Sequence, residues 1–87
     1  MQLSNAVRQR ILQISKDNNQ SLKEISRISN VPYSTLISFM IGKTKTLTLS
    51  TLFDLCNGMN TNLYDFFDSS IFKDVVDEHE KRLKSNV

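Results

Sequence analysis

The sequence predicts an all-α protein with a single domain. Apolar residues recur at steps of three and four along most of its 87 residues, which is the spacing of one helix face. No segment shows the alternation of apolar and polar residues that is typical of a β-strand. Two glycines and one proline provide few loop formers, and this favours helices joined by short turns. A chain of this length suits one compact domain.

The first two helices are predicted on either side of a polar break at residues 16–20. Ser21 and Glu24 then have the spacing of a capping box, in which each side chain satisfies a free backbone amide at a helix start. The second helix should end near Ser29, because Asn30 tolerates the left-handed conformation of a tight turn. The apolar face of the first helix is formed by Leu3, Val7, Ile11 and Ile14, and that of the second by Leu22, Ile25 and Ile28.

A third helix is predicted from Pro32 to Gly42. Proline suits the first turn of a helix, where its missing N–H costs nothing, and glycine is a common C-terminal cap. The inward face is formed by Leu36, Phe39 and Met40. The stretch from Ile28 to Gly42 carries no charge, but it is too short and too rich in hydroxyl groups to cross a bilayer.

Three further helices complete the prediction. The fourth begins at Thr48, and the fifth begins at Asn62, which lies three residues before Asp65. The apolar face of the fourth is formed by Leu49, Leu52, Leu55, Cys56 and Met59. That of the fifth is formed by Leu63, Phe66 and Phe67. The sixth is marked by Ile71, Phe72, Val75, Val76 and Leu83.

The charges are distributed unevenly along the chain. Residues 1–45 hold seven Lys or Arg against two Asp or Glu, whereas residues 46–87 hold four against seven. A basic half beside an acidic half favours one face that meets a polyanion and another that is kept away from it.

The two helices on either side of residues 29–31 form a helix-turn-helix. The stretch at residues 21–67 resembles the phage-repressor/Cro (XRE-type) DNA-binding domain, and the resemblance covers roughly residues 4–68. The resemblance implies a five-helix lambda-repressor-like domain over residues 1–69, with the motif at about 21–41, and an additional C-terminal helix and tail over residues 70–87. Asn30 stands where the family prefers glycine. The matching residues are Ser26, Val31, Ser34-Thr35-Leu36, Phe39, Gly42-Lys43 and Thr51-Leu52.

The resemblance also implies which residues meet double-stranded DNA. The start of the third helix enters the major groove, where short donors and acceptors reach base edges. The expected base contacts are Pro32, Tyr33, Ser34, Ile37 and Ser38. The expected phosphate contacts are Ser21, Lys23, Thr35, Lys43, Thr44, Lys45 and Thr46, with Arg8, Arg10 and Arg27 as lesser candidates. The implied function is that of a small transcriptional regulator, with repression favoured over activation.

A second interpretation is a protein-interaction module of the antirepressor or antitoxin type. Tyr33, Ile37 and Ile41 lie four residues apart and form an apolar stripe on the third helix, which is unusual for a DNA reader. The basic residues Lys43 and Lys45 favour DNA, although loop lysines are often merely solvated. Both interpretations stay open at this stage.

Several other features narrow the function. An enzyme needs a nucleophile beside a base, or a pair of carboxylates in a pocket, and we identify neither pattern in the sequence. The sequence also implies no cofactor, metal or small-molecule ligand. Cys56 is expected to be a buried, inert thiol, and the lone His79 is not expected to bind metal. The resemblance implies a homodimer that uses either the sixth helix or the Phe66/Phe67 region, although the sixth helix can equally fold back on its own core. We expect a cytoplasmic protein without a membrane segment, encoded by a bacterium or a phage. When bound to DNA, it is expected to be associated with the nucleoid.

Overall fold

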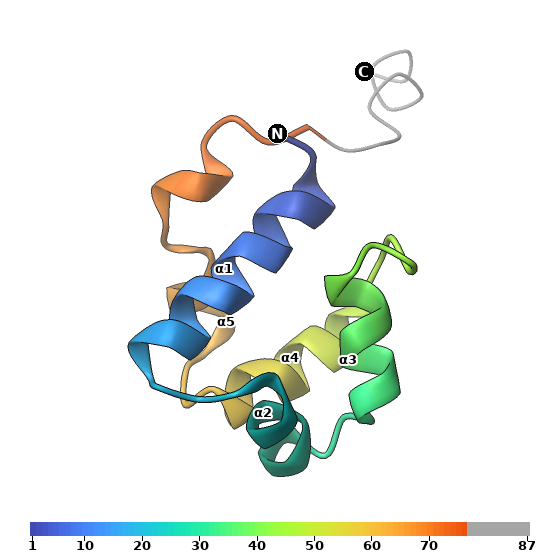
Figure 1. Ribbon diagram of the computed structural model, residues 1–87. Coiled ribbons are helices and arrows are strands. Elements are labelled where there is room, and N and C mark those ends of the chain that lie inside the picture. The colour runs from blue at the N-terminus through green and yellow to red at the C-terminus, as the bar shows by residue number, and fades with distance from the viewer. Residues whose placement is uncertain (77–87) are drawn as a thin grey trace.

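The computed structural model describes residues 1–76, which form five α-helices and one short 3-10 helix (Figure 1). Apart from an isolated bridge between Gln2 and Val76, this part of the chain contains no β-structure, so the all-α prediction is confirmed. The helices are α1 (Leu3–Asp17), α2 (Leu22–Ser29), α3 (Tyr33–Met40), α4 (Leu49–Gly58) and α5 (Leu63–Phe67), followed by the 3-10 helix η1 (Ser70–Phe72).

The core contains most of the predicted inward residues. Val76, predicted for the sixth helix, is exposed. Four residues predicted for the apolar faces of the first five helices are exposed as well: Leu3, Ile28, Leu49 and Phe67. Each of these four residues lies in the first or last turn of its helix, where the apolar face extends beyond the part that neighbouring helices cover. The fully buried large side chains are Ile11, Ile25, Leu36, Phe39, Leu55, Cys56, Met59 and Phe66.

The helix-turn-helix has the predicted caps. The Ser21 hydroxyl accepts a hydrogen bond from the backbone N–H of Glu24 at 3.1 Å, which satisfies one free amide at the start of α2. Asn30 ends α2 in the left-handed conformation, with φ 62° and ψ 24°. Pro32 lies one position earlier than predicted, as the N-cap of α3, and its carbonyl accepts the first helical hydrogen bond, from Leu36.

Helices α2 and α4 pack closely because small residues line their contact. Ser29 is buried on α2, and Gly58 faces it from α4. A Cβ atom added to Gly58 would lie 2.7 Å from the Ser29 Cβ and 3.0 Å from the Ile25 carbonyl oxygen. Gly58 therefore sets the distance between α2, the first helix of the helix-turn-helix, and α4, which packs against it.

The prediction of a sixth helix is wrong for residues 70–76, the part of it that the structure describes. Residues 70–72 form only the 3-10 helix, and the chain then turns back along α1 to the bridge at Val76. No side chain caps the start of α1, and the free N–H of Leu3 instead donates to the Val76 carbonyl at 2.9 Å. The N–H of Val76 donates to the Met1 carbonyl at 3.0 Å. This long-range pairing replaces the helical hydrogen bonds, and the rest of the predicted helix, including Leu83, lies outside the described residues.

Candidate nucleic-acid interface

The N-terminal half of α3 faces solvent. Its opposite side carries Leu36 and Phe39 into the core, which fixes the orientation of the helix. As a result, the residues predicted to contact bases lie on the outer side: Pro32, Tyr33 and Ser34 are exposed, and Ile37 and Ser38 are half-buried. Thr35, predicted to contact phosphate, is also exposed.

The start of α2 lies beside the start of α3. The Lys23 ammonium is 5.7 Å from the centre of the Tyr33 ring, which places a cation next to the exposed end of α3. Ser21 caps α2 two residues earlier and is itself exposed. These two predicted phosphate residues thus form one edge of the surface around α3.

The loop after α3 forms a second edge. Gly42 takes a φ of +84°, a conformation that other residues adopt with strain, and turns the chain away from the helix. The backbone N–H of Thr44 then donates to the Ser38 carbonyl at 3.0 Å, which ties the loop to the end of α3. The four predicted phosphate residues of this loop are all exposed: Lys43, Thr44, Lys45 and Thr46. We call this group the basic loop.

Arg8 holds the basic loop in place, a role that the sequence analysis missed. Its Nε donates to the Phe39 carbonyl at 2.6 Å, and one terminal nitrogen donates to the Thr44 carbonyl at 3.1 Å. The guanidinium also lies 4.7 Å from the centre of the Phe39 ring. A single side chain of α1 therefore satisfies carbonyls at the end of α3 and within the loop.

Two of the three lesser phosphate candidates donate hydrogen bonds to carbonyl groups within the domain. Arg8 is used as just described, and Arg10 donates to the carbonyls of Phe66 and Asp65 at 2.7 and 2.8 Å, where it caps the end of α5. Only Arg27 is free of such contacts on an exposed position of α2. The signal in the sequence was the position of both arginines beside the buried face of α1, where a long side chain reaches carbonyls at the ends of neighbouring helices.

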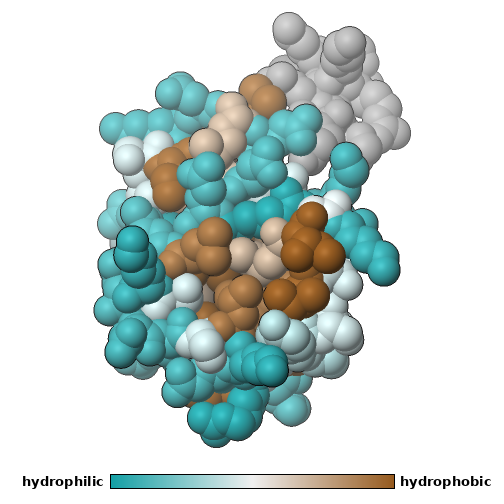
Figure 2. All heavy atoms as spheres, in the orientation of Figure 1, coloured by the Kyte–Doolittle hydropathy of each residue, from teal (hydrophilic) through white to brown (hydrophobic). Residues whose placement is uncertain are grey.

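The apolar stripe on α3 is present but not continuous. Tyr33 and Ile41 are exposed, while Ile37 between them is half-buried. Apolar atoms gather in the middle of this face of the molecule, between α1 and α3, with polar atoms around them (Figure 2). The face is thus suited to contacts with thymine methyl groups or with a protein.

Cys56 is buried as predicted, and burial raises the pKa of its thiol to about 11, so the thiol is protonated at neutral pH. Among residues 1–76, no three His, Cys, Asp or Glu side chains are grouped as a metal site would require, and no helix is long and apolar enough to span a bilayer. His79 lies outside the described residues.

The comparisons with known proteins show the fold. No family model matches the sequence, and no curated protein matches it. The structure is similar to a crystal structure of the prophage Lp1 protein 11, with a TM-score of 0.74 at 20% sequence identity. The match covers 86% of this chain and all of the other. The protein therefore has a helical domain fold that also occurs in a phage-related protein.

Proposed function

We propose that this protein binds double-stranded DNA as a small transcriptional regulator of the phage-repressor/Cro type, with residues 32–41 in the major groove. The observation that carries the proposal is the position of the exposed start of α3 between Lys23 and the basic loop. A helix of eight residues is about 12 Å long, which is similar to the width of the groove. Cations on both sides of the helix then lie where the phosphates of the two strands run.

Each part of this surface has a chemical role in the proposal. Ser34 and Ser38 hydrogen-bond base edges, and Tyr33 and Ile37 pack on thymine methyl groups. Lys23 and the basic loop bind phosphates, which positions α3 without reading sequence. Ser21 and Thr35 add hydroxyl contacts to the backbone. The protein acts by occupying its site rather than by catalysis, and occupation of a promoter represses it.

A protein-interaction role is the second candidate, because Tyr33 and Ile41 expose apolar surface on α3. The two roles differ in their response to salt. DNA binding releases counterions, so log affinity falls with log salt by about 0.9 for each phosphate neutralised. An apolar protein contact has no comparable dependence.

The test is fluorescence polarisation with a random-sequence duplex over a range of salt concentrations. We expect tight binding at low salt that weakens steeply, and a Lys43→Ala/Lys45→Ala variant should bind more weakly with a slope smaller by roughly 2. The matched control is Lys16→Ala/Lys73→Ala, which removes the same charge from exposed positions outside the surface and should keep the wild-type slope. Absence of binding by the wild type at low salt would reject the proposal in favour of the interaction role.

A further inference from the structure

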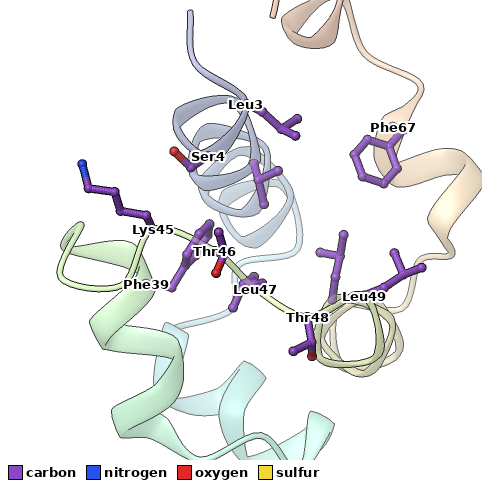
Figure 3. A pocket seen from close by; sticks show the side chains of 11 residues that line it. Leu3, Ser4, Phe39, Lys45, Thr46, Leu47, Thr48, Leu49 and Phe67 are labelled. Carbon is purple, nitrogen blue, oxygen red and sulfur yellow. The ribbon is translucent and has the colours of Figure 1, made fainter. Parts of the chain in front are cut away.

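An open hollow of about 360 Å³ lies between the start of α1, the loop before α4 and the end of α5. Its floor is lined by three buried side chains: Val7, Phe39 and Leu52. Leu3, Leu49 and Phe67 point toward this space from three different segments and form an apolar rim (Figure 3). None of the residues proposed to contact bases lines the hollow, so it is a separate site that borders the basic loop.

The basic loop supplies hydrogen-bond donors at the border of the hollow. Lys45 and Thr46 both line it, and Leu47 follows them. The hydroxyl of Thr46 and the backbone N–H groups of Thr46 and Leu47 have no hydrogen-bond partner among residues 1–76. No Asp or Glu of the described chain lines the hollow. A ligand with a negatively charged acceptor group at one end and an apolar body therefore complements these walls.

Lys45 is able to serve such a ligand without movement of the backbone. Its side chain points away from the hollow in Figure 3, is exposed, and forms no hydrogen bond or ion pair within residues 1–76. The preceding residue is fixed, because Arg8 donates to the Thr44 carbonyl at 3.1 Å. The ammonium is a point charge on a flexible stem of four carbons, so rotation about the bonds of the stem brings it over the opening of the hollow.

The volume of the hollow sets the size of the ligand. At about 30 Å³ for each water-sized group, 360 Å³ holds roughly 12 non-hydrogen atoms. A carboxylic acid with a chain of about ten carbons has this size, and the volume lies within the range of ~300–1,000 Å³ that is typical of small-molecule sites. The chain of such an acid covers rim side chains that are otherwise exposed, by 36% at Leu3, 70% at Leu49 and 40% at Phe67.

We propose that the hollow binds a free hydrophobic carboxylic acid of this size in its ionised form, such as a medium-chain fatty acid. The apolar chain lies over Phe39 and between the rim side chains. The carboxylate lies at the border, where it pairs with the Lys45 ammonium and accepts hydrogen bonds from the loop. Apolar contact provides most of the affinity, and the charge selects an acid over an alcohol or an amine.

The consequence for DNA rests on the proposed function. Lys45 is one of the cations of the basic loop that is proposed to bind phosphate, and an ammonium paired with the ligand is no longer available to the duplex. The acid should therefore weaken DNA binding, and the protein becomes a regulator that a hydrophobic acid releases from its site. Binding of the acid itself does not depend on DNA, so it is tested first without DNA.

The experiment is an amide NMR titration of the full chain with sodium decanoate. We expect saturable shifts that are centred on residues 3–7, 45–49 and 67, with a dissociation constant between about 10 μM and 1 mM for a ligand of roughly 12 non-hydrogen atoms. Decan-1-ol, which has the same chain without the charge, should bind more weakly. Decylammonium, which reverses the charge, should bind more weakly than the alcohol.

Two variants test the two ends of the ligand. Lys45→Ala should raise the dissociation constant for decanoate about 3–5-fold and leave that for decan-1-ol unchanged, because it removes one exposed ion pair. The matched control is Lys43→Ala, which removes the same charge from a loop residue that does not line the hollow and should keep the affinity for decanoate.

Leu49→Glu places a carboxylate on the rim and should raise the dissociation constant for decanoate by at least ~10-fold. Leu49 is the first residue of α4, where a negative side chain is favourable, so the fold should be retained. Its control is Leu12→Glu, since Leu12 is also exposed but does not line the hollow.

Polarisation titrations with a duplex then test the link to DNA. Saturating decanoate should lower the DNA affinity of the wild type and reduce the salt slope by about 0.9, the contribution of one phosphate contact. Lys45→Ala has already lost this contact, so decanoate should not change its slope. A wild-type slope that decanoate leaves unchanged would overturn the exchange of Lys45 between ligand and DNA.

The proposal of the site has its own contrary outcomes. Absence of saturable shifts at the hollow by about 5 mM decanoate overturns it, whether or not the protein binds DNA. Shifts that saturate at residues elsewhere also overturn it, as does equal affinity for decanoate and decylammonium. Binding to vesicles of anionic phospholipid without binding to monomeric decanoate would replace the free acid by a membrane surface and contradict the proposal.

Discussion

Arg8 illustrates how a single side chain of the scaffold positions residues at the surface. Its three nitrogens each have a hydrogen-bond partner: the carbonyls of Phe39 and Thr44, and the side-chain oxygen of Asn5. A guanidinium offers donors in a rigid planar arrangement, whereas an ammonium is a single point on a flexible stem. Lysine at this position would keep the charge but lose the simultaneous contacts.

We therefore predict that Arg8→Lys weakens DNA binding without changing its salt slope. The loop would be held less firmly, so part of the binding free energy would go into ordering it, while the number of phosphate contacts stays the same. The variant should also be less stable by about 1–2 kcal/mol through loss of charge-assisted hydrogen bonds. Polarisation titrations at several salt concentrations and urea unfolding measure the two effects.

Arg27→Lys is the control for this prediction, because Arg27 is exposed on α2 without such contacts. It should leave both the affinity and the stability close to the wild type. If Arg8→Lys binds DNA as tightly as the wild type, Arg8 stabilises the fold but does not position the basic loop.

At the scale of elements, the helix starts were predictable because their signals are local. Ser21, Thr48 and Asn62 each accept a hydrogen bond from the backbone N–H three residues later, as their sequence spacing indicated. Asn30 can end α2 in the left-handed conformation because the short polar side chain of asparagine tolerates it. The starts of α2, α4 and α5 and the end of α2 therefore followed from residues within one turn of each boundary.

The features that were not predicted depend on contacts between distant residues. Arg10 and Phe66 are 56 positions apart, and the bridge from Gln2 to Val76 joins the two ends of the described chain. The apolar spacing at residues 71–76 suggested a helix, yet a single 3-10 turn is enough to pack the partly buried Phe72 ring on the core. For the candidate site, exposure of α3 followed from its buried face, whereas the support of the basic loop by Arg8 did not.

Gly58 gives a prediction at this scale. Gly58→Ala should destabilise the protein by about 1–3 kcal/mol, because the added Cβ would overlap the Ser29 Cβ and the backbone of α2. The higher helix propensity of alanine, worth about 1 kcal/mol, is already deducted. Urea unfolding followed by far-UV circular dichroism measures the difference.

Asn57→Ala separates packing from helix propensity in that experiment. Asn57 is exposed one position earlier in α4, so its replacement raises propensity without bringing atoms toward α2. It should leave stability unchanged or slightly higher. Equal stability of Gly58→Ala and Asn57→Ala would show that α2 and α4 can separate at little cost.

For the whole molecule, the two ends of the described chain act as one structural unit. Phe72 is the last residue of η1 and packs with Phe66 and Phe67, at ring-centre distances of 6.0 and 4.9 Å. Four residues later the chain pairs with the N-terminus beside α1 (Figure 1). The start of α1 and the α5 region are thereby joined.

This arrangement predicts that Phe72→Ala affects more than its own surroundings. Loss of the ring should lower the free energy of unfolding by about 2–3 kcal/mol, somewhat less than for a fully buried phenylalanine because Phe72 is only partly buried. Because residues 73–76 are positioned by η1, amide hydrogen exchange should also become faster at Leu3 and Val76, whose N–H groups take part in the pairing. Leu12→Ala, at an exposed position of α1, should change neither quantity substantially. Faster exchange confined to residues 66–72, with Leu3 and Val76 still protected, would show that the pairing at the termini holds without the aromatic contact, and that the described chain closes on itself at two independent points.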